Sequence, residues 1–355
     1  LGPALTVAVG IAGAAVGSRV LLFTDGLANC GVGAIRQGAA SAAHPFYLDV
    51  AKAATSAGAS VSVLTLEGEV CSMENLGTTA DVTGGQVDIV DPAKMSVAVG
   101  AVLQNAPVGT AVECSVLLAE DLHVAHNVEG EPMARKAVQS CGTATKDTDV
   151  TVRFACDEQI VQQEKKRQAM LLAAPADDQA WELVGVPAEG EEEAKSGGTM
   201  PKAQIGARVM PFQLQLRYTL PSGQTMLSVI NTSRQLASDR SLAEADVNSS
   251  VIALSAIHKS AQLAQTGEYQ KARIGLISTQ RLLQRAMRNA RHQQDYLSFV
   301  VQAEKLDQFM REVQVQEQVF GQGCSASRKQ QRDDEASKAM YQMKAVSTTA
   351  FEARA

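Results

Sequence analysis

The sequence predicts a multidomain protein in which an α/β unit, an all-β unit and an all-α unit follow one another. Helical and strand-like patterns alternate over residues 1–92, strand-like runs dominate residues 93–235, and apolar residues recur at helical spacing over residues 241–320. We therefore expect a partial doubly wound, Rossmann-like sheet, then a β-sandwich and then a helical bundle. Residues 321–355 are polar and are predicted to form a tail or an exposed helix.

The α/β unit is predicted to start its sheet with the strand Val20–Phe23. Its residues are apolar without alternation, which is typical of a strand that is covered on both faces. Val61–Leu66 and Val87–Val90 are the next strands, and the helical stretches between them imply right-handed crossovers and a parallel sheet. Asp25 follows the first strand, so it should lie at the carboxyl edge, where open α/β sheets bind ligands.

The all-β unit is inferred from runs of apolar and β-branched residues between turn signals. The runs are Ser96–Leu103, Val112–Leu118, Val150–Phe154, Phe212–Thr219 and Thr225–Val229. Because Pro221 and Gly223 provide a turn, residues 212–229 are expected to form a hairpin. The acidic, Gly-rich segment 189–198 is expected to be a solvated, mobile loop.

The helical unit contains the most promising binding residues. Its first helix is expected to start at a capping box, Ser241 to Glu244, and its second helix to run from Tyr269 to Arg291. Four basic residues would lie along one face of that second helix: Arg281, Arg285, Arg288 and His292. They form either a solvated face that neighbouring acids balance or a surface that binds an acidic protein.

Composition argues against several classes of partner. The chain has 355 residues and a net charge of −6, so it lacks the overall positive field that drives binding to nucleic acids or anionic membranes. The apolar segment Leu5–Val16 is too short to span a bilayer, so no membrane insertion is expected. We expect an intracellular, cytoplasmic protein.

Motifs for catalysis and for zinc are missing from the sequence. None of the six cysteines is spaced as Cys-x-x-Cys, which argues against a zinc ribbon and favours buried, reduced thiols. His123 and His126 would point to opposite faces of a strand, so no zinc site is expected between them. No phosphate-binding loop and no nucleophile elbow occurs, so the chain is not expected to be an enzyme.

Two stretches resemble known families. Residues 1–92 resemble the carboxyl-terminal half of a von Willebrand factor A (vWA) domain, through Leu1–Leu5, Phe23–Ala28 and Thr83–Gly85. The second stretch, residues 212–257, resembles the inner-coat Sec proteins of COPII vesicles. The residues that carry this similarity are Phe212–Thr219, Gly223, Val229–Thr232 and a helix expected to begin at Ala245 and Asp246. Residues 1–33 are also similar to the vWA region of circularly permuted Ras-like proteins.

The vWA resemblance implies a Mg²⁺ site to which Asp25 would contribute one ligand. The Asp-x-Ser-x-Ser loop that would supply other ligands does not occur here, and the matching Thr would precede Leu1. Mg²⁺ would therefore bind only if upstream residues complete the site, since one carboxylate does not hold this ion. Otherwise Asp25 should cap the loop Gly26–Gly33, and the sheet should have an open edge unless upstream residues cover it.

Two functions agree with these expectations. In the first, the chain is a non-enzymatic protein–protein interaction scaffold in a large assembly, either a coat-like trafficking complex or a cytoskeletal or ciliary complex. In the second, it is the carboxyl-terminal regulatory part of a larger enzyme, for instance a protein that contains a GTPase.

Overall fold

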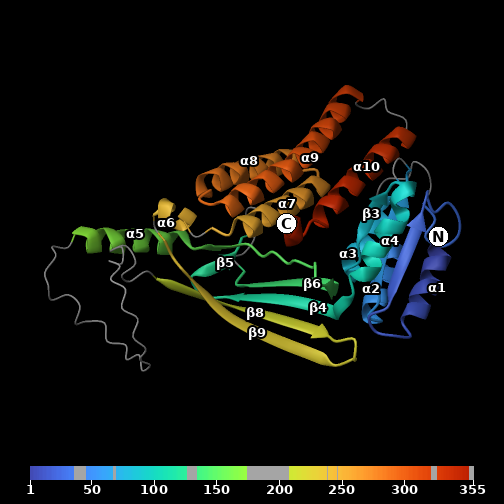
Figure 1. Ribbon diagram of the computed structural model, residues 1–355, viewed down its shortest axis with the longest axis horizontal. Helices are drawn as coiled ribbons and strands as arrows, with labels where there is room; N and C mark the ends of the chain where they lie inside the picture. Colours follow the sequence, from blue (N-terminus) through green and yellow to red (C-terminus); the bar gives the residue numbers. More distant parts are fainter. Residues whose placement is uncertain are drawn as a thin grey trace.

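The computed structural model describes residues 1–35, 45–66, 69–125, 134–173, 208–237, 239–245, 247–320 and 326–351. Three units follow one another along the chain, an α/β unit, a β-sheet unit and a helical unit (Figure 1). The predicted fold class is thus confirmed.

The α/β unit is built on a parallel sheet of order β1-β2-β3. Its elements are α1 (Gly2–Ala12), β1 (Arg19–Thr24), α2 (Pro45–Ser56), β2 (Ser60–Leu66), α3 (Met73–Thr83) and β3 (Val87–Val90). β2 is the central strand and is buried except at Leu66. The expectation that Val20–Phe23 is covered on both faces is wrong, because only Val20 of this strand is buried and Phe23 is 49% exposed. β1 is also an edge strand of the described sheet.

The segment after β3 is a helix, α4 (Met95–Gln104), and not the predicted strand Ser96–Leu103. The Asp91 carboxylate accepts a hydrogen bond from the backbone N–H of Ala93 at 3.0 Å and starts a 3₁₀ turn, Pro92–Lys94, that continues into α4. The apolar side chains of this segment suggested burial, but only Val102 is buried. A capped turn therefore leads into a helix here, although the apolar run had favoured a strand.

The β unit contains a four-stranded antiparallel sheet of order β6-β4-β8-β9 and a small sheet of two strands. The strands are β4 (Pro107–Leu118), β5 (Leu122–Val124), β6 (Lys136–Thr145), β7 (Phe154–Cys156), β8 (Val209–Thr219) and β9 (Thr225–Gln235). Residues from β4, β5, β7 and β8 share one hydrophobic cluster, so the small sheet of β5 and β7 packs on the large one. The β8–β9 hairpin is confirmed.

Other expectations for the β unit need correction. The predicted strand Val150–Phe154 starts only at Phe154, while β6 and helix α5 (Glu158–Ala173) were not predicted. Segment 189–198 lies outside the described residues.

The helical unit consists of α6 (Arg240–Ala245), α7 (Ser249–Gln265), α8 (Tyr269–Ala286) and α9 (Ala290–Phe320). Its buried core contains Leu254, Ile257, Leu283, Phe299 and Leu306 among others. The predicted capping box does not form as expected. The cap before α6 is the carboxylate of Asp239, which accepts hydrogen bonds from the backbone N–H and the hydroxyl of Ser241 at 3.1 and 2.6 Å.

The carboxyl-terminal helix α10 (Ala326–Lys344) corrects the expectation of a polar tail or exposed helix for residues 321–355. It packs against α3 on one side and α7 and α9 on the other, so it bridges the α/β and helical units (Figure 1). Its charged residues Asp334 and Lys338 are buried together with Met340 and Tyr341. In the described part of the chain, no helix is long and apolar enough to cross a membrane.

Candidate functional site

Asp25 lies at the carboxyl end of β1, as predicted, and is exposed. The loop after β1 is held by Thr24 instead, whose hydroxyl donates to the carbonyl of Gly26 at 2.9 Å and accepts from its N–H at 3.4 Å. Among the described residues, no three His, Cys, Asp or Glu side chains are grouped as metal ligands. The role of Asp25 in binding Mg²⁺ remains a prediction.

The four basic residues do not lie on one helix. α8 carries Arg281 and Arg285 but ends at Ala286, Arg288 lies in the connection, and His292 lies in the first turn of α9. Arg285 forms an ion pair with Glu244 at 3.0 Å, and His292 Nδ1 is 3.1 Å from the carbonyl oxygen of Ala286.

The break between α8 and α9 therefore divides the predicted basic face. Arg281 and Arg288 are both exposed, and neither forms an ion pair with any described residue. These two arginines are the part of the basic set that is available to a partner.

His123 has a carboxylate partner. Its Nδ1 lies 2.7 Å from Oδ1 of Asp157, while His126 lies outside the described residues. Buried, reduced thiols were expected, and Cys71 and Cys114 fit this expectation, whereas Cys30 is exposed. Burial and the nearby Asp334 carboxylate raise the pKa of the Cys71 thiol to about 11, so it is protonated and poorly nucleophilic at neutral pH.

A polar contact between α10 and the start of α3 was not predicted. Ser72 precedes α3 in the left-handed region, with φ of 58°, and its side chain does not cap the helix. Asp334 of α10 takes this role, because its carboxylate accepts from the backbone N–H groups of Met73 and, at 3.1 Å, of Cys71. Lys338 Nζ is 3.1 Å from the Asp334 carboxylate and also donates to the carbonyl of Glu69.

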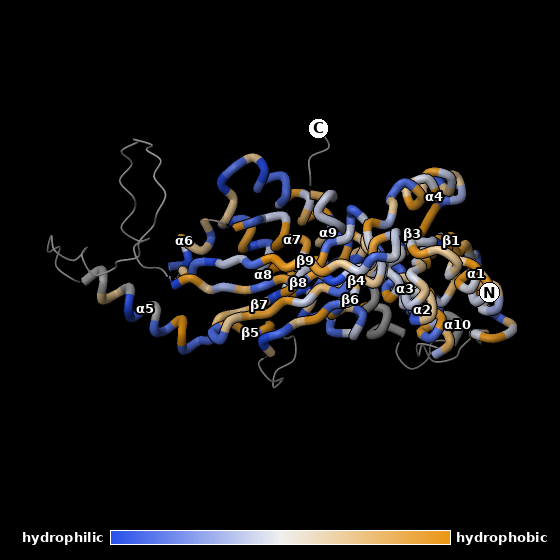
Figure 2. The backbone as a smooth tube through the Cα atoms, turned by 90° about the horizontal axis from the view of Figure 1, so that it is seen from below, coloured by the Kyte–Doolittle hydropathy of each residue, from blue (hydrophilic) through white to orange (hydrophobic). Residues whose placement is uncertain are grey.

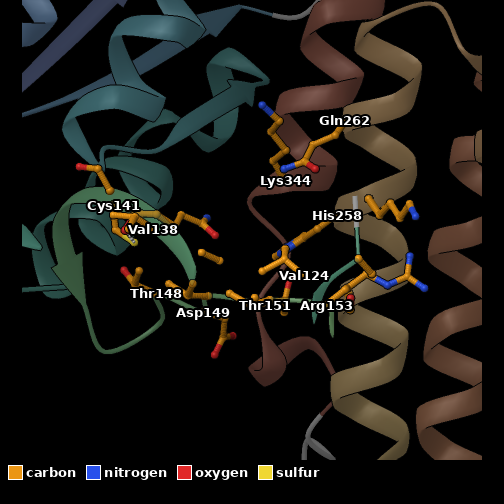
Figure 3. Close-up of a pocket in the computed structure, with 18 of the residues that line it drawn as sticks. Val124, Val138, Cys141, Thr148, Asp149, Thr151, Arg153, His258, Gln262 and Lys344 are labelled. Carbon is orange, nitrogen blue, oxygen red and sulfur yellow. Dashed lines mark hydrogen bonds between the residues drawn. The ribbon is translucent and has the colours of Figure 1, made fainter. Parts of the chain in front are cut away.

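A cavity of about 460 Å³ lies between β6, the segment before β7, α7 and the end of α10 (Figure 3). His258 of α7 enters it, and its Nε2–H donates to the carbonyl of Val346 at 2.7 Å. Burial lowers the pKa of His258, so the ring is neutral at pH 7. Asp81 and Lys344 form an ion pair of 2.9 Å at one side of the cavity. Side chains from all three units thus line one space.

β9 is an edge strand of the large sheet (Figures 1 and 2). Its side chains are the most exposed of those on the long strands of this sheet. Its apolar side chains Met226, Leu227, Val229 and Ile230 are between 38% and 56% exposed. Met226 and Ile230 lie beside Tyr218 and Leu214 of β8, on the face of the sheet that holds the core. Leu227 and Val229 are on the opposite face, beside the polar residues of β8, so core packing does not account for them.

Comparisons with known proteins find similarity both in sequence and in structure. No protein-family model matches the chain. Over 307 residues it is 22% identical to Circularly permutated Ras protein 1 of Dictyostelium discoideum, a match that covers 86% of this chain. The chain spans only 31% of the length of that relative. The resemblance to circularly permuted Ras-like proteins is confirmed, and it extends well beyond residues 1–33.

The solved structures that this chain resembles share less sequence identity with it than the Dictyostelium protein does. The human COPII-coat protein Sec24c aligns with a TM-score of 0.44 and 14% identity, over 95% of this chain and 42% of that one. A von Willebrand factor type A protein from Catenulispora acidiphila aligns with a TM-score of 0.43 and 10% identity, over 86% of this chain and 62% of that one. The families that the sequence resembles thus recur among the structures to which this chain is similar.

Proposed function

We propose that this chain is a non-enzymatic protein–protein interaction scaffold that acts in a large intracellular assembly, such as a coat-like trafficking complex or a cytoskeletal or ciliary complex. The observation that carries this proposal is the open strand β9. Among the described residues, β9 is paired on one side only, by β8, so the backbone N–H and C=O groups of its other edge are available.

β9 lacks the features that usually protect an edge strand from pairing. Over its 11 residues it has no proline, lysine or acidic residue, and Arg234 is its only charge. An extended segment of a partner protein would add to this edge by backbone hydrogen bonds. Leu227 and Val229 would contact alternate apolar side chains of that segment, which provides specificity.

Lysines at these two positions test the proposal. The variant Leu227→Lys/Val229→Lys should bind a purified partner at least about tenfold more weakly, because edge lysines oppose strand addition and apolar contact is lost. A matched control, Val97→Lys/Ile274→Lys, changes two exposed apolar residues far from β9 in the chain. The affinity is measured by calorimetry, and hydrogen exchange of the β9 amides should slow when the partner binds. Equal affinity in both variants would exclude β9 as the binding site of the partner.

The exposed arginines Arg281 and Arg288 are proposed as a second contact, for an acidic surface on a partner. The same binding measurement is made with Arg281→Glu/Arg288→Glu and with a control reversal of two exposed lysines, Lys52→Glu/Lys305→Glu. Weaker, salt-dependent binding of the arginine variant alone would support this contact. Unchanged binding would exclude Arg281 and Arg288 as a contact for the partner.

A second candidate function is favoured by the sequence match to a protein named as a Ras protein. In this proposal the chain is the carboxyl-terminal regulatory part of a larger protein that contains a GTPase. The test is to add the purified chain to the part of the Dictyostelium relative that lies outside the match and to measure single-turnover GTP hydrolysis. A changed rate would favour regulation, whereas an unchanged rate would favour the scaffold. The chain alone should not hydrolyse GTP.

A further inference from the structure

The cavity between α7 and the β unit brings together two positive side chains that pair with no acidic side chain among the described residues. Arg153 lies in the segment before β7 and Lys259 on α7, and both line the cavity. Neither forms an ion pair within the described parts of the chain. Burial lowers the pKa of Lys259, and the nearby Arg153 guanidinium lowers it further, so the two cations are close enough to repel each other.

The two acids that line the cavity already have partners. Asp81 is paired with Lys344, and the Asp149 carboxylate accepts hydrogen bonds from the N–H and the hydroxyl of Thr348 at 2.6 and 3.0 Å. Figure 3 shows Arg153 next to the helix that carries His258 and Gln262, while Asp149 lies farther from that helix. The α7 side of the cavity is therefore the positive side.

We propose that this cavity binds a small phosphate ester, with its phosphate group held between Arg153 and Lys259. A phosphate monoester carries nearly two negative charges at pH 7, which matches two adjacent cations, whereas a carboxylate supplies one. The cavity volume of about 460 Å³ is within the range of small-molecule sites. Hydroxyls of Thr151 and Ser255 also line the cavity and are available as further donors.

A ligand at this position would link all three units. The cavity is lined by residues of α3, β6, α7 and α10, so its occupant contacts elements that belong to different cores. Binding to the folded state alone shifts the unfolding equilibrium, so the melting temperature should rise with ligand concentration.

The test uses inorganic phosphate and glycerol 3-phosphate as probes at constant ionic strength, with acetate as the singly charged comparison. Binding is followed by calorimetry and by the melting temperature. Arg153→Gln and Lys259→Gln should each weaken phosphate binding at least about tenfold, because each removes a charged hydrogen-bond donor. The controls Lys52→Gln and Lys305→Gln remove exposed lysines on α2 and α9 and should leave binding unchanged.

Folding of the variants is checked without ligand. Removal of either cation relieves repulsion, so the melting temperature of both cavity variants should be unchanged or higher. The proposal is overturned if phosphate does not bind, if it binds the cavity variants as tightly as the controls, or if acetate binds as tightly as phosphate.

Discussion

Asp334 is one of the α10 residues that bind the α/β unit. The first backbone N–H groups of a helix lack partners within it, and the Ser72 side chain does not cap those of α3. The Asp334 carboxylate accepts hydrogen bonds there, at the positive end of the helix dipole, and Lys338 balances its charge. The side chains of this ion pair are only 2% and 6% exposed, so water does not replace either partner.

Replacement of Asp334 by alanine should therefore strongly destabilise the folded protein. Asp334→Ala leaves a buried lysine without its partner and two N–H groups without an acceptor, and we expect a loss of about 3–5 kcal/mol in the free energy of unfolding. Urea unfolding measures this loss. Glu335→Ala, one residue further on the same helix and exposed, is the control and should change stability by less than about 0.5 kcal/mol. A similar effect of both variants would contradict the capping role.

Individual elements were predictable from the sequence where local signals decide the structure. The β8–β9 hairpin follows from alternation and from the turn at Gly223, whose φ is +82°. The end of α8 was missed because Met287 turns to an extended conformation without a glycine or proline to signal it. α10 was misjudged because burial of Asp334 depends on N–H groups more than 260 positions earlier in the chain. No local pattern carries that information.

The contact between helices α3 and α10 depends on a residue without a side chain. A Cβ atom at Gly77 would lie 2.3 to 2.6 Å from three ring atoms of Tyr341, which is buried and whose hydroxyl is 3.3 Å from that of Thr78. Alanine usually stabilises a helix relative to glycine by about 1 kcal/mol. Here the clash should exceed that gain, because overpacking a tight contact costs about 1–3 kcal/mol.

We therefore expect Gly77→Ala to lower the melting temperature and Gly10→Ala to raise it slightly. Gly10 is also inside a helix, but a Cβ atom there would meet nothing within 4 Å. Gly10→Ala therefore measures the effect of helix propensity on stability without a clash. When Tyr341→Ala is combined with Gly77→Ala, the total loss should be smaller than the sum of the single losses, since the clash is gone. Strict additivity would show that the two residues do not share a contact.

At the scale of the whole molecule, the α/β unit is joined by close contacts both to the β unit and to the helical unit. Gly84 and Gly142 let α3 and β6 approach, since a Cβ atom at Gly84 would lie 2.2 Å from the carbonyl oxygen of Thr143. Tyr341 belongs to the core of the α/β unit, while Met340, its neighbour on α10, belongs to the core of the helical unit. Neither unit can release α10 without opening its own core, so the two should unfold together.

This coupling predicts a single calorimetric transition in the wild-type chain. In Asp334→Ala/Tyr341→Ala, α10 keeps its contacts with α7 and the Lys344–Asp81 ion pair with α3. It loses the Asp334 hydrogen bonds at the start of α3 and the packing of the Tyr341 ring, so the transition should split into two, with the α/β unit melting first. The control Leu306→Ala weakens only the helical core, where Leu306 is buried. Because α10 still links the units in Leu306→Ala, the unfolding transition of this variant should move to lower temperature as a single peak. Two resolved peaks in the wild-type chain would show that α10 does not couple the units.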